Sequence, residues 1–132
     1  MKQYIAGFLD ADGTIGISPN GVVNVEFYNA DINILQSIQK VYGGKIKTRK
    51  PLKKEHNISH TLILIYDKAI KLIEDVSPFM IHGKKKARAD LIIKYYKKYT
   101  PRNGKYTPDL LEKKKWLIDK VKGVVMRGQG AY

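Results

Sequence analysis

Residues 5 to 13 read Ile-Ala-Gly-Phe-Leu-Asp-Ala-Asp-Gly, a short apolar stretch that ends in two carboxylates one residue apart. We expect a helix over residues 2–10, with Gly13 in the left-handed conformation that commonly ends a helix. Asp10 and Asp12 then lie at the helix C-terminus, where the macrodipole already carries partial negative charge. A divalent cation would offset this charge, so metal-assisted hydrolysis is the first hypothesis.

Composition indicates an anionic partner. The chain has 132 residues, with 25 Lys and Arg against 12 Asp and Glu, for a formal net charge of +13. This favours nucleic acid first and an anionic membrane surface second. There is no Cys, no apolar run long enough to span a membrane, and Asp10 interrupts the N-terminal apolar stretch. We therefore expect an intracellular protein, in a prokaryotic cytoplasm or an organelle, that is not secreted and does not cross a membrane.

The hydrophobic pattern predicts one domain over residues 1–125 and a loose tail at 126–132. Alternating apolar residues indicate strands at 14–18 and 23–28, joined by a tight turn at 19–21. Asp31 is a candidate N-cap for a helix that ends at Gly43-Gly44. The later elements are strands 45–50 and 59–66 around a basic loop at 51–57, and helices 67–76, 84–99 and 108–122. The order αββαββα with extra C-terminal helices indicates an α+β fold, in which helices cover one face of an antiparallel sheet.

Residues 8–14 also resemble the first motif of haloacid-dehalogenase-type phosphatases, in which the first acid, here Asp10, is a nucleophile at the end of a strand. That family has a doubly wound parallel sheet, whereas this chain has short hairpins between its predicted strands. Its magnesium site also needs a downstream acidic pair. The adjacent downstream acids, Glu74-Asp75, lie in a helical pattern, so this alternative is remote.

Residues 5–13 more closely resemble the signature of the LAGLIDADG homing endonucleases. Segments 42–47 and 78–94 are similar to later parts of the same family, and the element order matches over most of residues 4–123. The resemblance implies an αββαββα fold with a saddle-shaped antiparallel sheet. It also implies a site-specific endonuclease that cuts double-stranded DNA by metal-dependent phosphodiester hydrolysis, with Mg²⁺ as the expected cofactor.

The chain carries a single motif, so the resemblance implies a homodimer that cuts a long, near-palindromic site. In such a family the staggered break supports mobility of an intron or intein gene. The alternative is a catalytically silent member that acts as an RNA-splicing maturase or a DNA-binding regulator.

By resemblance, the metal is held by the Asp12 carboxylate and the Ala11 backbone carbonyl. A family lysine four residues before a small residue matches Lys85 when the small residue is Ala89, and a shifted alignment keeps Lys84 as the alternative. A polar residue near the end of the second strand orders water in the family. Asn29 is the candidate, with a role as a turn residue before the next helix left open.

The same helix supplies the expected dimer interface. Ala6 and Gly7 are small enough to let a second helix approach closely, which would explain a glycine inside a helix. Asp10 belongs to this region, where structural capping or hydrogen bonding is the favoured role over metal binding.

Period-two alternation predicts which side chains on the polar face of the sheet read DNA. Ile15, Ile17, Val23, Val25 and Phe27 should face the core, with Ile46 inward in the second hairpin. The predicted DNA-binding residues are Ser18, Asn20, Asn24, Glu26, Tyr28, Lys45, Lys47, Arg49 and His60.

Overall fold

The computed structural model describes residues 1–49 and 58–124, so the predicted loop at 51–57 and the tail at 126–132 lie outside the described residues. In chain order the elements are α1 Lys2–Asp12, β1 Gly13–Ile17, β2 Val23–Asn29, α2 Ile32–Tyr42, β3 Lys45–Arg49, β4 Ser59–Ile65, α3 Tyr66–Val76, the 3₁₀ helix η1 Ser77–Phe79, α4 Gly83–Tyr95 and α5 Pro108–Gly123. In the described part of the chain, no helix has the length and apolarity needed to cross a membrane.

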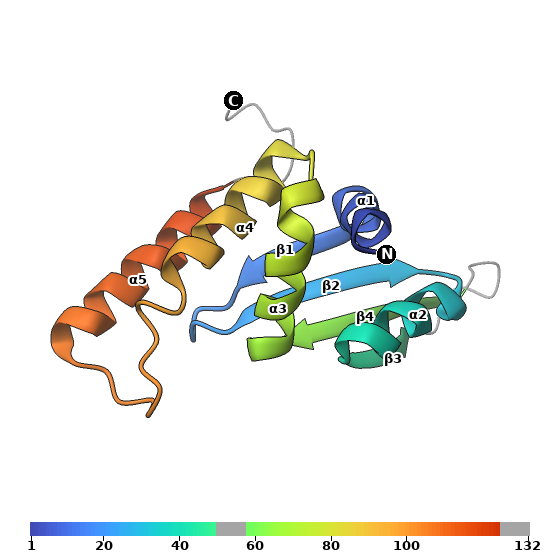
Figure 1. Cartoon of the computed structure of the whole chain (residues 1–132). Coiled ribbons are helices and arrows are strands. Elements are labelled where there is room, and N and C mark those ends of the chain that lie inside the picture. Colours follow the sequence, from blue (N-terminus) through green and yellow to red (C-terminus); the bar gives the residue numbers. More distant parts are fainter. Residues whose placement is uncertain (50–57, 125–132) are drawn as a thin grey trace.

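The four strands form one antiparallel sheet in the order β1-β2-β4-β3. Helices α1, α2 and α3 lie against one face of this sheet, and α4 and α5 lie side by side at its β1 edge (Figure 1). The predicted α+β class and element order are confirmed. The antiparallel pairing rules out the doubly wound parallel sheet that the phosphatase alternative requires.

Alternating burial along the strands forms the core. Every second residue of β1 is buried, and β2 follows the same pattern from Val23 to Phe27. These side chains pack against the apolar sides of the helices, where residues such as Leu9, Leu35 and Ile73 are fully buried. One face of the sheet is therefore apolar and covered, as predicted, and the opposite face carries polar side chains.

The end of α1 differs from the prediction. The helix continues to Asp12, and Gly13 is extended, with φ −121° and ψ 175°, as the first residue of β1. The expected left-handed conformation of Gly13 is wrong. A Cβ at this position would lie 2.5 Å from Leu9 Cδ1 and 3.0 Å from the Glu26 carbonyl oxygen. Glycine is required here because α1 and β2 approach each other closely, not because of backbone dihedral angles.

Other helix ends follow the predicted chemistry. The Asp31 side chain accepts a hydrogen bond from the Asn33 amide, and the Thr107 side chain caps α5 in the same way. At the end of α2, Gly43 and Gly44 have φ values of 81° and 100°, which favour glycine. The helix expected at 84–99 is regular only to Tyr95 and continues as hydrogen-bonded turns.

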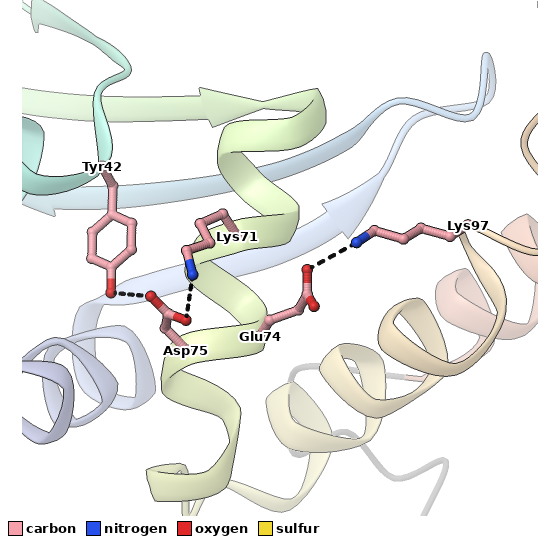
Figure 2. Close-up of polar contacts among 5 residues, drawn as sticks. All are labelled: Tyr42, Lys71, Glu74, Asp75 and Lys97. Atoms are coloured by element: carbon pink, nitrogen blue, oxygen red, sulfur yellow. Dashed lines mark hydrogen bonds and ion pairs between the residues drawn. The ribbon is translucent and has the colours of Figure 1, made fainter. Parts of the chain in front are cut away.

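Carboxylates on α3 join this central helix to its neighbours on both sides (Figure 2). Tyr42, the last residue of α2, donates a hydrogen bond of 2.8 Å to Asp75, which also accepts one from Lys71 at 3.2 Å. On the other side, Glu74 accepts a hydrogen bond from Lys97 at 3.4 Å. Burial and the Asp75 carboxylate raise the pKa of Tyr42 to about 12. The Tyr42 hydroxyl in turn lowers the pKa of Asp75.

The Tyr42–Asp75 bond gives the first prediction. Tyr42→Phe should reduce the free energy of unfolding at neutral pH by about 1–2 kcal/mol, because it removes a hydrogen bond to a charged group. Since the folded-state pKa of Asp75 is lowered, this contribution is lost as the pH falls through that pKa. Urea denaturation at several pH values should show the wild-type advantage shrinking in acid. Lys97→Met, which breaks a more exposed pair, is the control and should have a smaller effect.

Candidate functional site

The C-terminal end of α1 presents an exposed carboxylate. Asp12 is the last residue of the helix, and its side chain and the neighbouring Ala11 are both exposed. The last four carbonyls of a helix have no partner inside it, so carboxylate and carbonyl oxygens gather at this end. Such hard oxygen donors are the ligands that magnesium prefers. The residues present therefore fit a divalent cation at Asp12 and the Ala11 carbonyl.

The exposed Asp12 does not belong to a larger cluster of ligand side chains in the described part of the chain. Within residues 1–49 and 58–124, no group of three or more His, Cys, Asp or Glu side chains is placed to hold a metal ion.

Lys85 is buried against the end of α1. It lies in the first turn of α4, is 9% exposed, and its Nζ donates hydrogen bonds to the carbonyls of Leu9 at 3.0 Å and Asp10 at 2.6 Å. Burial lowers the pKa of Lys85, and the carboxylates of Asp10 and Asp12 act in the opposite direction. The fold therefore brings Lys85 to the acidic end of α1.

Asp10 has a structural position, as expected. Its Oδ2 accepts a hydrogen bond of 2.8 Å from the backbone amide of Ile81, in the segment between η1 and α4. Its Oδ1 is buried and has no hydrogen-bond partner within the described residues. Asp10 thus ties the end of α1 to the segment that precedes Lys85.

Asn29 ends β2 and takes part in two features. Its Oδ1 accepts a hydrogen bond of 2.8 Å from the Asp31 amide, which is the turn role that the sequence left open. It also lines a surface hollow of about 420 Å³, together with Asp12 and residues of α1 and α2. The remaining lining residues are Gln3, Tyr4, Gly7, Phe8 and Ile34.

The two small residues of α1 have different surroundings. Ala6 is fully buried in the chain's own core, so the expectation that it lies on an exposed interface is wrong for the single chain. The helical periodicity places Ala6 beside Ile5 and Leu9 on the inner side of α1. Gly7 is exposed, and a Cβ built on it would have no described neighbour within 4 Å. Nothing in this part of the chain therefore explains the glycine.

The polar face of the sheet forms rows of side chains across the strands. The pairing places Thr14 beside Glu26, Glu26 beside Ile63 and Ile63 beside Lys45. A second row runs from Tyr28 through Thr61 to Lys47, and a third joins Gly16, Asn24 and Ile65. Arg49 lies opposite Ser59 at the end of β3. Ser18 and Asn20 lie in the turn beyond β1, where the Ser18 Oγ accepts a hydrogen bond from the Val22 amide.

His60 does not share this face. It is two residues from Leu62, which is fully buried, and it pairs with Thr48, so it lies on the helix-covered side of the sheet. There its Nδ1 is 2.9 Å from Thr48 Oγ1. The prediction that His60 lies beside Lys45, Lys47 and Arg49 is wrong, because a period of two puts it on the same side as Leu62.

Sequence reasoning missed several residues near these surfaces. Thr61, Ile63 and Ile65 of β4 lie on the polar face, and counting by two from Leu62 would have found them. Arg88 of α4 donates hydrogen bonds to the carbonyls of Ile15 and Val124. This link between the β1 edge and the end of α5 has no local signal in the sequence, because it depends on tertiary packing.

Solved structures of homing endonucleases are similar to this chain. I-CvuI, solved in complex with its target in the presence of calcium, is 22% identical, with a TM-score of 0.71 over 97% of this chain and 83% of that chain. I-TnaI is 16% identical, with a TM-score of 0.67 over 99% of this chain and 91% of that chain. The LAGLIDADG homing endonuclease I-SmaMI, bound to cleaved DNA, is 18% identical, with a TM-score of 0.66 over 98% of this chain but 45% of that chain.

These likenesses define the class of fold. The chain has the fold of the LAGLIDADG homing endonucleases, and its residues 5–13 lie in the helix whose end presents Asp12. No protein-family profile and no curated protein matches the sequence.

The burial of Lys85 gives a stability prediction. Lys85→Met should lower the free energy of unfolding by about 1–3 kcal/mol, because two carbonyls at the end of α1 lose their hydrogen-bond donor. Lys115→Met, at an exposed lysine of α5, is the control and should cost less. Chemical denaturation of both variants makes the comparison, and a larger loss for Lys115→Met would contradict the assignment.

Proposed function

We propose that this protein is a site-specific endonuclease that cuts double-stranded DNA by metal-dependent phosphodiester hydrolysis. The observation that carries the proposal is the exposed Asp12 at the end of α1, on a fold shared with DNA-bound homing endonucleases. A phosphodiester resists hydrolysis unless the attacking water is activated and the leaving oxygen is stabilised, and divalent cations do both.

The chain acts as a homodimer in this proposal, with the exposed side of α1 at the two-fold axis. Gly7 is open to solvent, which leaves room for a second helix to approach its backbone closely. A single chain supplies only one exposed motif carboxylate, and a second copy brings its own Asp12 to the other strand of the DNA. This chain matches less than half of I-SmaMI, as expected if I-SmaMI is a longer chain that contains two units of this fold.

Around the metal, this chain's residues have distinct roles. Asp12 and the Ala11 carbonyl would hold Mg²⁺, which supplies Lewis-acid activation of water when bound. Lys85 lies beside them and stabilises the negative charge that develops on the phosphate. Asn29, at the edge of the same hollow, orients water in the site. Asp10 positions the end of α1 through its bond to the Ile81 amide.

The polar face of the sheet reads the DNA sequence in the major groove. Lys45, Lys47 and Arg49 are donors suited to guanine, Asn24 is suited to adenine, and Glu26 can accept from the cytosine amine. Ser18, Asn20 and Tyr28 extend this face. Ile63 and Ile65 offer apolar contact of the kind that thymine methyl groups accept. The target of a symmetric dimer should be near-palindromic. Cleavage at such a target would support the mobility of an intron or intein gene inside the cell.

A dimer variant tests the interface. Gly7→Leu should convert the dimer to a monomer, because the side chain blocks the approach of a second helix. The fold should remain intact, since a Cβ there meets nothing within the described residues. Light scattering measures the mass and circular dichroism the fold. Gly123→Leu, at an equally open glycine at the end of α5, is the control and should stay dimeric. A wild-type protein that is monomeric both free and with DNA would refute the dimer.

Another prediction concerns catalysis. Asp12→Asn should abolish cleavage of target DNA while leaving specific binding intact, because the amide keeps the shape of the side chain but does not hold the metal. Asp67→Asn, at an exposed acid of α3, should cut normally. Targets come from incubation with randomised duplexes and magnesium, followed by sequencing of the ends. An Asp12→Asn protein that still cuts with magnesium would overturn the mechanism.

A final prediction distinguishes hydrogen bonding to bases from general attraction to phosphates. Lys47→Ala or Arg49→Ala should relax preference at particular base pairs by roughly 1–3 kcal/mol if the side chain bonds a base edge. Lys40→Ala, on α2 and outside the polar face of the sheet, should leave the preference unchanged. Selection on randomised targets measures the preference. Uniform weakening over all sequences would assign Lys47 and Arg49 to phosphates instead.

A further inference from the structure

Most of the chain's positive charge lies outside the sheet. Residues 83–123, which span α4 and α5, hold fourteen Lys and Arg but four Asp and Glu, and so contribute ten of the thirteen net charges. Among the described residues, the polar face of the sheet carries the cations Lys45, Lys47 and Arg49 and the acid Glu26. The charge that points to a polyanion is therefore concentrated on α4, α5 and the segment between them, at the β1 edge of the molecule (Figure 1).

Three aromatic rings gather where α5 meets the end of α4. Tyr95 and Tyr99 are stacked, with centroids 5.5 Å apart and planes at 16°. Trp116 of α5 packs edge-on against both, at 5.1 Å from Tyr95 and 6.4 Å from Tyr99. The tyrosines are half-buried, whereas the Trp116 side chain is 40% exposed. A large aromatic surface is thus open to solvent beside a helix rich in lysine.

Each ring has a lysine ammonium next to it. The Nζ of Lys94 is 5.3 Å from the Tyr95 centroid, that of Lys113 is 6.0 Å from Tyr99, and that of Lys120 is 6.0 Å from Trp116. Lys94 and Lys120 are exposed. Lys113 also pairs with Asp109 at 3.2 Å. These six residues, three rings and three lysines, form an aromatic–lysine patch.

We propose that the aromatic–lysine patch binds a single strand of nucleic acid, separately from the duplex on the sheet. Bases of an unpaired strand stack on exposed aromatic rings, and its phosphates are neutralised by neighbouring cations, which is how sequence-tolerant single-strand binding is built. In a duplex the base faces are covered by their neighbours, so a duplex would meet only the lysines. An acidic peptide would likewise use the lysines but has no need of the rings.

Trp116 is the single tryptophan of the chain and therefore reports directly on the patch. Titration with a 20-nucleotide dT strand should quench its fluorescence through stacking, and a 20-nucleotide U strand tests whether the sugar matters. Quenching by either strand supports the proposal, and a preference between them identifies the sugar. The matched control probe is a strand of the same length and charge whose sugars carry no bases. It should bind more weakly and leave the fluorescence unchanged. Equal affinity and equal quenching by the abasic strand would overturn the proposal.

Variants locate the site by anisotropy of the labelled dT strand. Trp116→Ala should weaken binding about fivefold or more, the effect of removing the ring on which one base stacks. Because this substitution also removes packing between α4 and α5, the exposed pair Lys94→Gln/Lys120→Gln provides an independent test. It should flatten the salt dependence, by about 0.7 in the slope of log K for each phosphate that is no longer neutralised.

Two control variants, each of which also removes two positive charges, test whether binding depends on the patch or only on the net charge of the protein. Lys115→Gln/Lys122→Gln removes two exposed lysines of α5 that have no ring contact in the described structure, and Lys47→Gln/Arg49→Gln removes two cations from the sheet. Both should bind the dT strand as the wild type does. If either control weakens binding as much as Lys94→Gln/Lys120→Gln, the patch is not the site. The Asp12→Asn protein should bind the strand normally, so the result does not depend on the endonuclease.

Discussion

The ammonium group of Lys85 bonds the carbonyls of Leu9 and Asp10, and the position of the end of α1 depends on this contact. A lysine in the first turn of α4 is poorly placed with respect to the dipole of its own helix. It is well placed with respect to α1, whose last carbonyls are negative and lack partners within the helix. The bond from the Ile81 amide to Asp10 joins the same two segments again. Asp12 therefore projects from a helix end that is fixed by both of these contacts.

The period of the apolar residues was enough to predict the fold. Strands with every second residue buried and helices with one apolar side leave few arrangements other than a half-covered antiparallel sheet. Local hydrogen-bond chemistry predicts Asp31 as a cap, because a cap acts within three residues along the chain. His60 could also have been placed correctly, since its spacing from Leu62 already indicates the covered face.

Contacts between segments that are distant along the chain could not be predicted from the sequence alone. Gly13 looked like a helix stop, but it is needed because a Cβ would collide with Leu9 and the Glu26 carbonyl, which only the packed structure reveals. Ala6 and Gly7 are adjacent and equally small, yet one is fully buried and the other is open. The motif could not separate them without the position of the sheet. The same limit applies to Lys85, where the resemblance indicated a lysine but only the fold shows that its charge is held against backbone carbonyls.

The separation of charge from sequence reading has a physical consequence. Phosphate contacts supply affinity that depends on salt but carry no sequence information, whereas contacts to base edges discriminate between sequences. In the proposed function, a reading face with a small excess of cations among its described residues would limit attraction to random DNA and leave discrimination to shape and hydrogen bonding. Glu26, which lies in a row with Lys45, would also repel phosphates that approach the face out of register. The ten net charges on residues 83–123 would raise the local concentration of nucleic acid from a different side of the molecule. The sheet could then be selective because a separate surface supplies the attraction.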